Sequence, residues 1–437
     1  MNKIGTYRWR ICALLFFATT INYLDRQVIG LLKPVLEDQF NWSETDYSNI
    51  VITFQAAYAI SLLGFGGIID RIGTKLGYSI SIVVWSIAAM LHAMATGTMS
   101  FAFMRDLLGL GEAGNFPAAI KTTAEWFPKK ERALATGLFN SGANIGAIVA
   151  PLTVPFIAVT FGWQWAFILT GILGFFWLIV WQKYYHTPAT HPKITPEELA
   201  YINSDMEPLA INEAPKAEKK YTWGMLLGYK QTWAFSIGKL LTDPIWWFYL
   251  FWLPDFLESQ YHIKGTAIAL PVAAVYTMSA VGSIFGGWLP MYLIKNNWPV
   301  FKARKSSMLM YAFLVLPILF AQVLGGMNMW LAVFVIGIAA AAHQAWSANI
   351  FTTVSDMFPK RAVGSVTGIG GMFGAIGGIL LSMAVQKNLF VHYRSIGQIE
   401  TAYYIMFIVC GSAYLLAWVI MHLLVPKVNV IAAEDLE

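Results

Sequence analysis

Twelve long apolar stretches dominate this chain of 437 residues. Each stretch is long enough to cross about 30 Å of hydrocarbon as a helix that rises about 1.5 Å per residue. Asp, Glu, Lys and Arg make up only 12% of the chain, against about 25% of an average soluble domain. The sequence therefore predicts an all-α polytopic membrane protein with transmembrane helices near residues 9–32, 47–69, 76–96, 99–120, 133–160, 163–185, 231–257, 266–294, 306–325, 327–351, 363–386 and 401–425.

Several protein classes lack support in this sequence. The net charge of +5 is not gathered in a basic patch interleaved with aromatic residues, so nucleic acid is not an expected partner. Cys12 and Cys410 both lie in apolar stretches, so neither a disulfide framework nor a thiolate metal site is predicted. An integral membrane enzyme or a sensor is the alternative from another class. No Ser-His-Asp set, paired metal ligands, HExxH spacing or soluble signalling domain favours either, and we expect no cofactor.

The basic residues predict how the chain sits in the membrane. Outside the long middle loop, sixteen Lys and Arg lie in connections on one side and four on the other. Basic loops face the cytoplasm, which places both termini there. The middle loop, residues 186–230, separates an N-terminal six-helix bundle (1–185) from a C-terminal six-helix bundle with a short cytoplasmic tail (231–437). Thr195-Pro196-Glu197-Glu198 predicts one short helix in this loop, capped by Thr195.

Several short segments of the first half recur in the second half. They are all separated by the same number of residues as Phe127 and Phe358. The segments Phe127-Pro128-Lys129, Thr136-Gly137 and Ile145-Gly146 recur as Phe358-Pro359-Lys360, Thr367-Gly368 and Ile376-Gly377. Chance similarity between Gly-rich helices is the alternative explanation. A parallel repeat instead predicts two related bundles with a substrate site at their interface, near the middle of the bilayer.

A few ionisable residues lie inside the predicted spans: Asp25, Arg26, Arg105, Asp106, Glu112, Lys239, Asp243 and His343. Each costs at least about 2.5–3.5 kcal/mol on insertion, which makes each a functional hypothesis. Arg105 and Glu112 are seven residues apart and project from nearly one helix face. Asp25 lies at a depth similar to that of Arg105 and could pair with it. Static ion pairs that help helices assemble are the structural alternative.

The seventh span and the tenth add polar groups that could face the same cavity. Lys239 and Asp243 share one face at i, i+4, and Pro244 frees backbone carbonyls beside them. The nearby aromatic residues, Trp247 among them, either stack on a sugar ring or form an interfacial belt. His343 corresponds to Glu112 at the repeat offset and, with Gln344 and Trp346, either faces the cavity or is a hydrogen-bonded structural group.

The turn after the second span, Gly66 to Lys75, reads G-G-I-I-D-R-I-G-T-K. Together with Arg105-x-x-x-Gly109 it resembles the major facilitator superfamily, whose signature loop is G-x-x-x-D-R-x-G-x-K. The resemblance covers essentially the whole chain and implies that a gate forms here from Asp70, Arg71, Gly73 and Lys75. The corresponding segment, Gly286-Gly287-Trp288-Leu289-Pro290, lacks the Asp-Arg pair, so other contacts are expected to close the second gate.

Further motifs resemble the anion:cation symporter family within that superfamily, and they narrow the resemblance to hexuronate transporters. The motifs are Asn22-Tyr23-Leu24-Asp25-Arg26, Gly111 to Pro117, Glu125 to Arg132, Leu241 to Pro254 and Ala342-His343-Gln344-Ala345. The resemblance implies that Asp25 and Glu112 handle protons and that Arg105 binds the substrate carboxylate. It also implies that Tyr58 and Asn144 line the sugar site. The antiporter motif of the fifth span survives only in part, as Gly137, Gly146 and Pro151, which favours symport.

These inferences predict a proton-coupled importer of glucuronate and galacturonate that works by alternating access, as a monomer in a bacterial inner membrane. The proton is the coupling ion, handled by Asp25 and Glu112 with Arg26 as ion-pair partner. Other sugar acids such as galactonate or glucarate, or an aromatic acid, are the alternatives within the transporter class. The expected substrate-binding residues are Arg105, Tyr58, Asn144, Lys239, Trp247, His343, Gln344 and Trp346.

Overall fold

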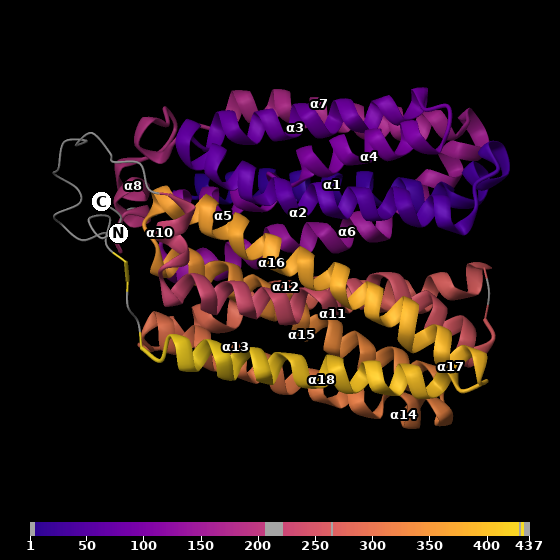
Figure 1. Cartoon of the computed structure of the whole chain (residues 1–437). Helices are drawn as coiled ribbons and strands as arrows, with labels where there is room; N and C mark the ends of the chain where they lie inside the picture. The colour runs from indigo at the N-terminus through magenta and orange to yellow at the C-terminus, as the bar shows by residue number, and fades with distance from the viewer. Residues whose placement is uncertain (1–4, 206–221, 264, 428–429, 432–437) are drawn as a thin grey trace.

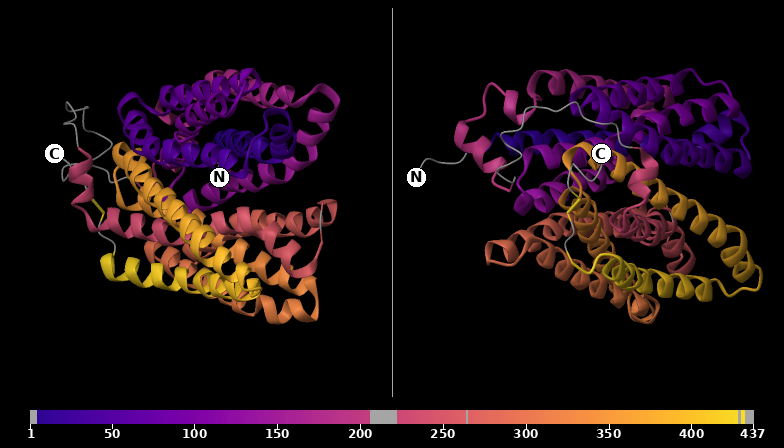
Figure 2. Two further views of the ribbon diagram at one scale, coloured as in Figure 1. Left: turned by 45° about the vertical axis from the view of Figure 1, so that its right-hand side comes forward. Right: turned by 60° about the vertical axis from the view of Figure 1, so that its left-hand side comes forward.

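The computed structural model describes residues 5–205, 222–263, 265–427 and 430–431. Its helices form two bundles that lie side by side, with both ends of the chain at one end of the molecule (Figure 1). The other two views show the same division (Figure 2). The first bundle contains α1 (Tyr7–Phe40), α2 (Glu44–Ile72), α3 (Thr74–Leu91), α4 (Thr98–Glu112), α5 (Asn115–Trp126), α6 (Lys129–Phe161) and α7 (Trp163–Tyr184). The second contains α11 (Lys230–Tyr261), α12 (Ala269–Lys295), α13 (Val300–Val315), α14 (Ala321–Met327), α15 (Met329–Met357), α16 (Val363–Ala384), α17 (Val391–Ser395) and α18 (Ile399–Leu424).

Twelve membrane spans are predicted, and the structure separates them into two kinds. Among the described residues, nine helices are long and apolar enough to cross a membrane by length and composition alone. The other three predicted spans correspond to α1, α4 with α5, and α11, which are also helical. These three carry most of the ionisable residues inside the predicted spans. The helices that do not meet this criterion of length and composition therefore carry most of the charged residues of the candidate site.

The predicted repeat between the two halves is present in the backbone. Phe127 ends α5 and Phe358 ends α15, both in an extended conformation, and each is followed by a proline with φ −64°. The continuation differs, because α6 begins directly at Lys129 whereas Lys360–Ala362 forms a 3-10 turn before α16. The two bundles therefore enter their next helices at equivalent places.

The predicted fourth span, 99–120, is wrong as a single helix. It is divided into α4 and α5 at Ala113 and Gly114. Gly111 lets α4 approach α3 closely, since a Cβ there would lie 2.4 Å from the backbone nitrogen of Trp85. Ser81 on α3 also donates a hydrogen bond of 2.6 Å to the carbonyl of Gly111. This close packing holds Glu112, the last residue of α4, in the interior of the bundle.

The short helix predicted in the middle loop is confirmed. It is α8 (Pro196–Ile202), and the Thr195 side chain accepts a hydrogen bond from the Glu198 backbone. Glu198 in turn accepts hydrogen bonds from the backbone nitrogens of Tyr7 and Arg8 at the start of α1. The middle loop is therefore fastened to the N-terminal bundle at the end that carries the termini. The distribution of Lys and Arg predicts that this end is cytoplasmic, and it is called the cytoplasmic end below.

Glycines bring the two bundles together at the cytoplasmic end. A Cβ on Gly66 of α2 would lie 2.4 Å from the carbonyl oxygen of Gly364, near the start of α16. A Cβ on Gly287 of α12 would lie 2.2 Å from the carbonyl oxygen of Ala133 on α6. Small residues at such crossings let helix backbones approach closely. The cytoplasmic ends of the bundles are thus in direct backbone contact.

Replacing Gly66 by alanine is expected to force α2 and α16 apart, because a backbone carbonyl cannot move away as a side chain can. Transport should fall several-fold, while equilibrium binding of substrate stays within about threefold of the unaltered protein. Gly64→Ala on the same helix is the matched control, since nothing lies within 4 Å of a Cβ there. Equal transport by the two variants would show that this crossing does not limit the cycle.

Candidate substrate and proton site

A cavity lies between the two bundles and is lined by side chains from both. It encloses about 630 Å³ of atom-free space, its solvent-open mouth included. Of the residues predicted to bind substrate or to pair with the proton site, six lie on its wall: Arg26, Tyr58, Lys239, Trp247, His343 and Gln344. The structure thus gathers at one cavity residues that are far apart in the sequence.

Arg26 is the cation on the N-terminal wall. Its Nη2 lies 2.7 Å from Oε2 of Glu112, and its Nε donates to the same oxygen over 2.9 Å. The guanidinium also packs against the rings of Tyr58 and Tyr23, with centroids 4.7 and 5.0 Å away. The Arg26 side chain is 18% exposed and that of Glu112 is fully buried. The cavity therefore meets the guanidinium first, with the carboxylate behind it.

Arg105, the predicted carboxylate ligand, is not among the cavity-lining residues. Its Nη2 donates a hydrogen bond of 2.8 Å to the backbone carbonyl of Arg26, and its guanidinium lies over the ring of Phe54. Within the described part of the chain, its Nε and Nη1 have no hydrogen-bond partner. Arg105 is therefore a buried cation that contacts the backbone of Arg26, and two of its donor nitrogens are unpaired among the described residues.

Asp25 is also buried away from the cavity wall. Its carboxylate forms no hydrogen bond with any described residue, and the ion pair with Arg105 that the sequence allowed is absent from the described residues. An unpaired carboxylate is costly to bury in its charged form.

A second ion pair lies on the C-terminal wall. Nζ of Lys239 is 2.6 Å from Oδ2 of Asp243, one turn further along α11. The ammonium lies over the ring of Phe351, 3.9 Å from its centroid. Here the exposures are reversed, since the Asp243 side chain is 20% exposed and that of Lys239 is 5% exposed. Both residues line the cavity, and on this wall the carboxylate is the more exposed member of the pair.

Polar and aromatic groups complete the C-terminal wall. His343 shares a hydrogen bond of 2.6 Å between its Nδ1 and the hydroxyl of Tyr414, and its ring stacks on Trp246. Gln344 accepts a hydrogen bond of 2.7 Å from Asn140 of the other bundle. Two predicted ligands, Asn144 and Trp346, are fully buried and are not among the lining residues. Trp346 packs edge-on against Tyr414 instead.

The predicted gate residue Asp70 joins the two bundles. Its carboxylate accepts hydrogen bonds from the backbone nitrogens of Gly364 and Ser365, over 3.1 and 2.6 Å, in the first turn of α16. The first N–H groups of a helix lack the carbonyl partners of the helix interior, and a carboxylate at a helix N-terminus is favoured by the helix dipole. Lys121 pairs with the same carboxylate at 2.8 Å. Gly73, with φ +86°, forms the turn between α2 and α3.

The remaining residues of the predicted gate play no such part. Arg71 is exposed and Lys75 is half-buried. Neither takes part in the hydrogen bonds that the structure records between the bundles in its described residues. Of the four predicted gate residues, Asp70 is thus the one whose side chain joins the two bundles at the cytoplasmic end.

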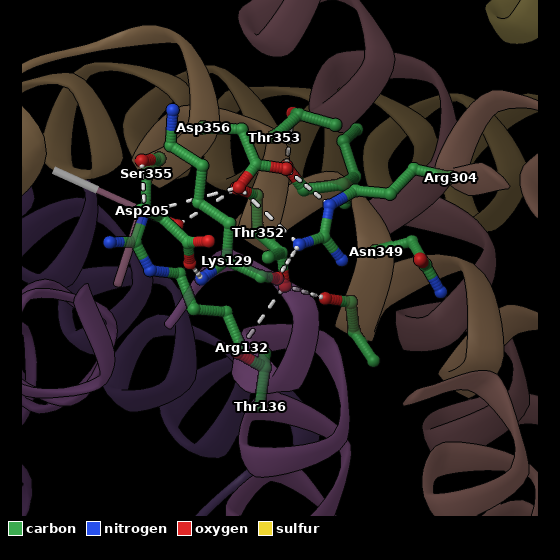
Figure 3. Close-up of polar contacts among 12 residues, drawn as sticks. Lys129, Arg132, Thr136, Asp205, Arg304, Asn349, Thr352, Thr353, Ser355 and Asp356 are labelled. Carbon is green, nitrogen blue, oxygen red and sulfur yellow. Dashed lines mark hydrogen bonds and ion pairs between the residues drawn. The ribbon is translucent and has the colours of Figure 1, made fainter. Parts of the chain in front are cut away.

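A second set of contacts between the bundles was not specified by the sequence analysis (Figure 3). Arg132 on α6 donates a hydrogen bond of 2.6 Å to the carbonyl of Ser355 on α15. Arg304 on α13 is paired with Asp356 and donates a hydrogen bond of 2.6 Å to the carbonyl of Lys129. These contacts join α6 to α13 and α15, and their part in a second gate stays a prediction. One feature of the sequence points to these contacts. Asp356 has the same place in the second half of the repeat as Glu125 has in the first half.

Two helical bundles with a polar cavity between them, closed together at one end, define a membrane transporter and not an enzyme. The chain belongs to the Major Facilitator Superfamily, which matches residues 15–382. It is 32% identical to the hexuronate transporter of Escherichia coli (strain K12) over 385 residues, 88% of each chain. It is 33% identical to the galacturonate transporter of Dickeya chrysanthemi over 295 residues, 68% of this chain and 85% of that one.

A solved structure supports the fold. The structure of the proton:xylose symporter XylE, bound to 6-bromo-6-deoxy-D-glucose, is similar to this chain with a TM-score of 0.78. The similarity covers 99% of both chains at 15% sequence identity, so it shows the fold alone. The chain is accordingly a multi-pass membrane transporter whose curated relatives include transporters of sugar acids.

Proposed function

We propose that this chain imports aldohexuronates together with protons, by alternating access across a bacterial inner membrane. The observation that carries the proposal is the Arg26–Glu112 pair, whose cation is the partner that reaches the cavity. A guanidinium is planar and binds a carboxylate through two parallel hydrogen bonds. The relatives named as hexuronate and galacturonate transporters support the same class of substrate.

In this proposal the substrate carboxylate replaces that of Glu112 on Arg26. Glu112 is fully buried, and a buried carboxylate that loses its cation is costly to keep charged. It therefore takes up a proton as the substrate binds. Arg105, bound to the backbone of Arg26 and with two donor nitrogens unpaired among the described residues, is a second cation that would stabilise a carboxylate during this exchange. Substrate binding and proton binding thus become one coupled event.

The rest of the wall would hold the sugar ring. Trp247 offers an aromatic face, and His343 and Gln344 offer polar atoms from α15. The hydrogen bond from Asn140 to Gln344 joins the two bundles within the cavity itself. Opening toward the cytoplasm must break this bond together with those of Asp70, Arg132 and Arg304. The proposed cycle is therefore a rocking of one bundle against the other around the bound sugar.

The test is uptake of labelled glucuronate into liposomes that contain the purified protein, with and without an imposed pH gradient. We expect galacturonate to compete with glucuronate, and glucose and galactose not to compete, because only the uronates carry a carboxylate for Arg26. An inward-directed proton gradient should drive accumulation. A hexose that competes as well as galacturonate would contradict the proposal. Stronger competition by galactonate than by either uronate would show that another sugar acid is the preferred substrate.

A further inference from the structure

The two ion pairs at the cavity differ in which member is more exposed, the cation or the carboxylate. In the N-terminal bundle the cation, Arg26, is exposed above a fully buried Glu112. In the C-terminal bundle both members line the cavity, but the carboxylate of Asp243 is 20% exposed and the side chain of Lys239 only 5%. An anion entering the cavity therefore meets a positive group on one wall and, on the other, a negative group that is more exposed than its cation. This polarity has a consequence for which sugar acids the cavity accepts.

The position of Asp243 is tightly fixed. Lys239 binds its Oδ2, and the ring of Phe351 covers the ammonium. Helix α16 meets the carboxylate at Gly374, where a Cβ would lie 2.3 Å from Oδ2. A larger residue at position 374 would displace the carboxylate. Asp243 is thus held between α11 and α16 with part of its side chain facing the cavity.

We propose that Asp243 determines substrate specificity by binding the end of the substrate opposite the carboxylate. This inference rests on the proposed uronate transport. An ionised carboxylate only accepts hydrogen bonds, and the oxygen that Lys239 does not bind suits a hydroxyl group of the substrate. A second carboxylate on the substrate would offer no donor and would place two negative charges close together in a medium of low polarity. Asp243 therefore favours acids with one carboxylate and a hydroxylated end, and excludes dicarboxylic sugar acids.

Glucarate is the direct probe, because it has the carbon chain of glucuronate with the aldehyde carbon oxidised to a second carboxylate. We expect glucarate to displace labelled glucuronate from the unaltered purified protein at least about tenfold less well than galacturonate does. Asp243→Asn removes the negative charge and leaves Lys239 uncompensated. The ratio of glucarate affinity to galacturonate affinity should then rise at least about fivefold. Asp255→Asn is the control, since Asp255 lies on the same helix in an exposed pair with Arg394.

Replacing Lys239, the other member of the pair, should change the ratio of glucarate affinity to galacturonate affinity in the opposite direction. Lys239→Gln leaves the negative charge of Asp243 without its cation, so discrimination against glucarate should increase. This variant also carries the test if Asp243→Asn does not fold. A structural role alone would impair both variants alike and leave the ratio of affinities unchanged.

The outcomes separate this inference from the proposed function. If the unaltered protein binds no glucuronate, the proposed uronate transport fails. If it binds glucuronate and glucarate equally well, or if both variants keep its ratio of affinities, the role of Asp243 fails while uronate transport stands. A raised ratio in Asp243→Asn, with a lowered ratio in Lys239→Gln, supports the assignment.

Discussion

Replacing Arg26 by lysine is expected to weaken glucuronate binding at least about tenfold, which corresponds to about 1.4 kcal/mol. Lysine keeps the positive charge but loses the planar fork that grips both carboxylate oxygens. It also loses the packing of the guanidinium between Tyr23 and Tyr58. Displacement of labelled glucuronate from the purified variant measures the effect. Arg394→Lys, at an exposed site, is the control and should bind normally.

Arg105→Lys provides the informative comparison. If Arg26 contacts the carboxylate in this closed state, Arg105→Lys should reduce affinity less than Arg26→Lys does. Arg105 does not line the cavity, and its recorded hydrogen bond reaches the backbone of Arg26. Arg105 remains the ligand predicted from the sequence. Normal glucuronate binding by Arg26→Lys, with a large loss of affinity in Arg105→Lys, would show that Arg105 binds the substrate carboxylate.

Replacing Glu112 by glutamine should abolish accumulation driven by a pH gradient while leaving exchange intact. The amide resembles the protonated carboxyl group, so Arg26 is permanently available to the substrate. Liposomes loaded with unlabelled glucuronate should therefore still take up labelled glucuronate at equal concentrations. Without substrate inside, an imposed proton gradient should produce no accumulation above equilibrium. Active accumulation by this variant would show that Glu112 does not couple the proton.

Asp25→Asn separates the two candidate proton sites. Asp25 is buried, outside the cavity wall, and its carboxylate has no hydrogen bond to a described residue. If Glu112→Gln accumulates substrate normally and Asp25→Asn does not, the coupling role belongs to Asp25. Loss of accumulation in both would mean that the two carboxylates act in succession.

The fold could be predicted because its main determinant is local. Length and apolarity define each span, and the repeat that relates Phe127 to Phe358 identifies the two halves. The break between α4 and α5 could not be predicted from apolarity, because the stretch around Glu112 is continuously apolar apart from a few charges. The break coincides with close packing of Gly111 and Gly114 against α3, which is a tertiary contact.

The site could be predicted only in part, since sequence places residues on helices but does not fix how each helix is rotated. Asp25 and Arg26 are neighbours, yet Arg26 lies on the cavity wall and Asp25 does not. The cytoplasmic contact of Arg132, Arg304 and Asp356 is built from three distant segments. The opposite exposure of the Arg26–Glu112 and Lys239–Asp243 pairs likewise depends on the packing between helices.

The central claim is that the substrate carboxylate replaces Glu112 on Arg26 and that a proton binds in the same event. The most direct measurement is proton uptake when glucuronate is added to purified protein in weakly buffered solution near neutral pH. By thermodynamic linkage, the account predicts uptake of about one proton for each glucuronate bound by the unaltered protein, and close to none by Glu112→Gln. Binding of glucuronate without proton uptake, or equal uptake by the two proteins, would contradict it.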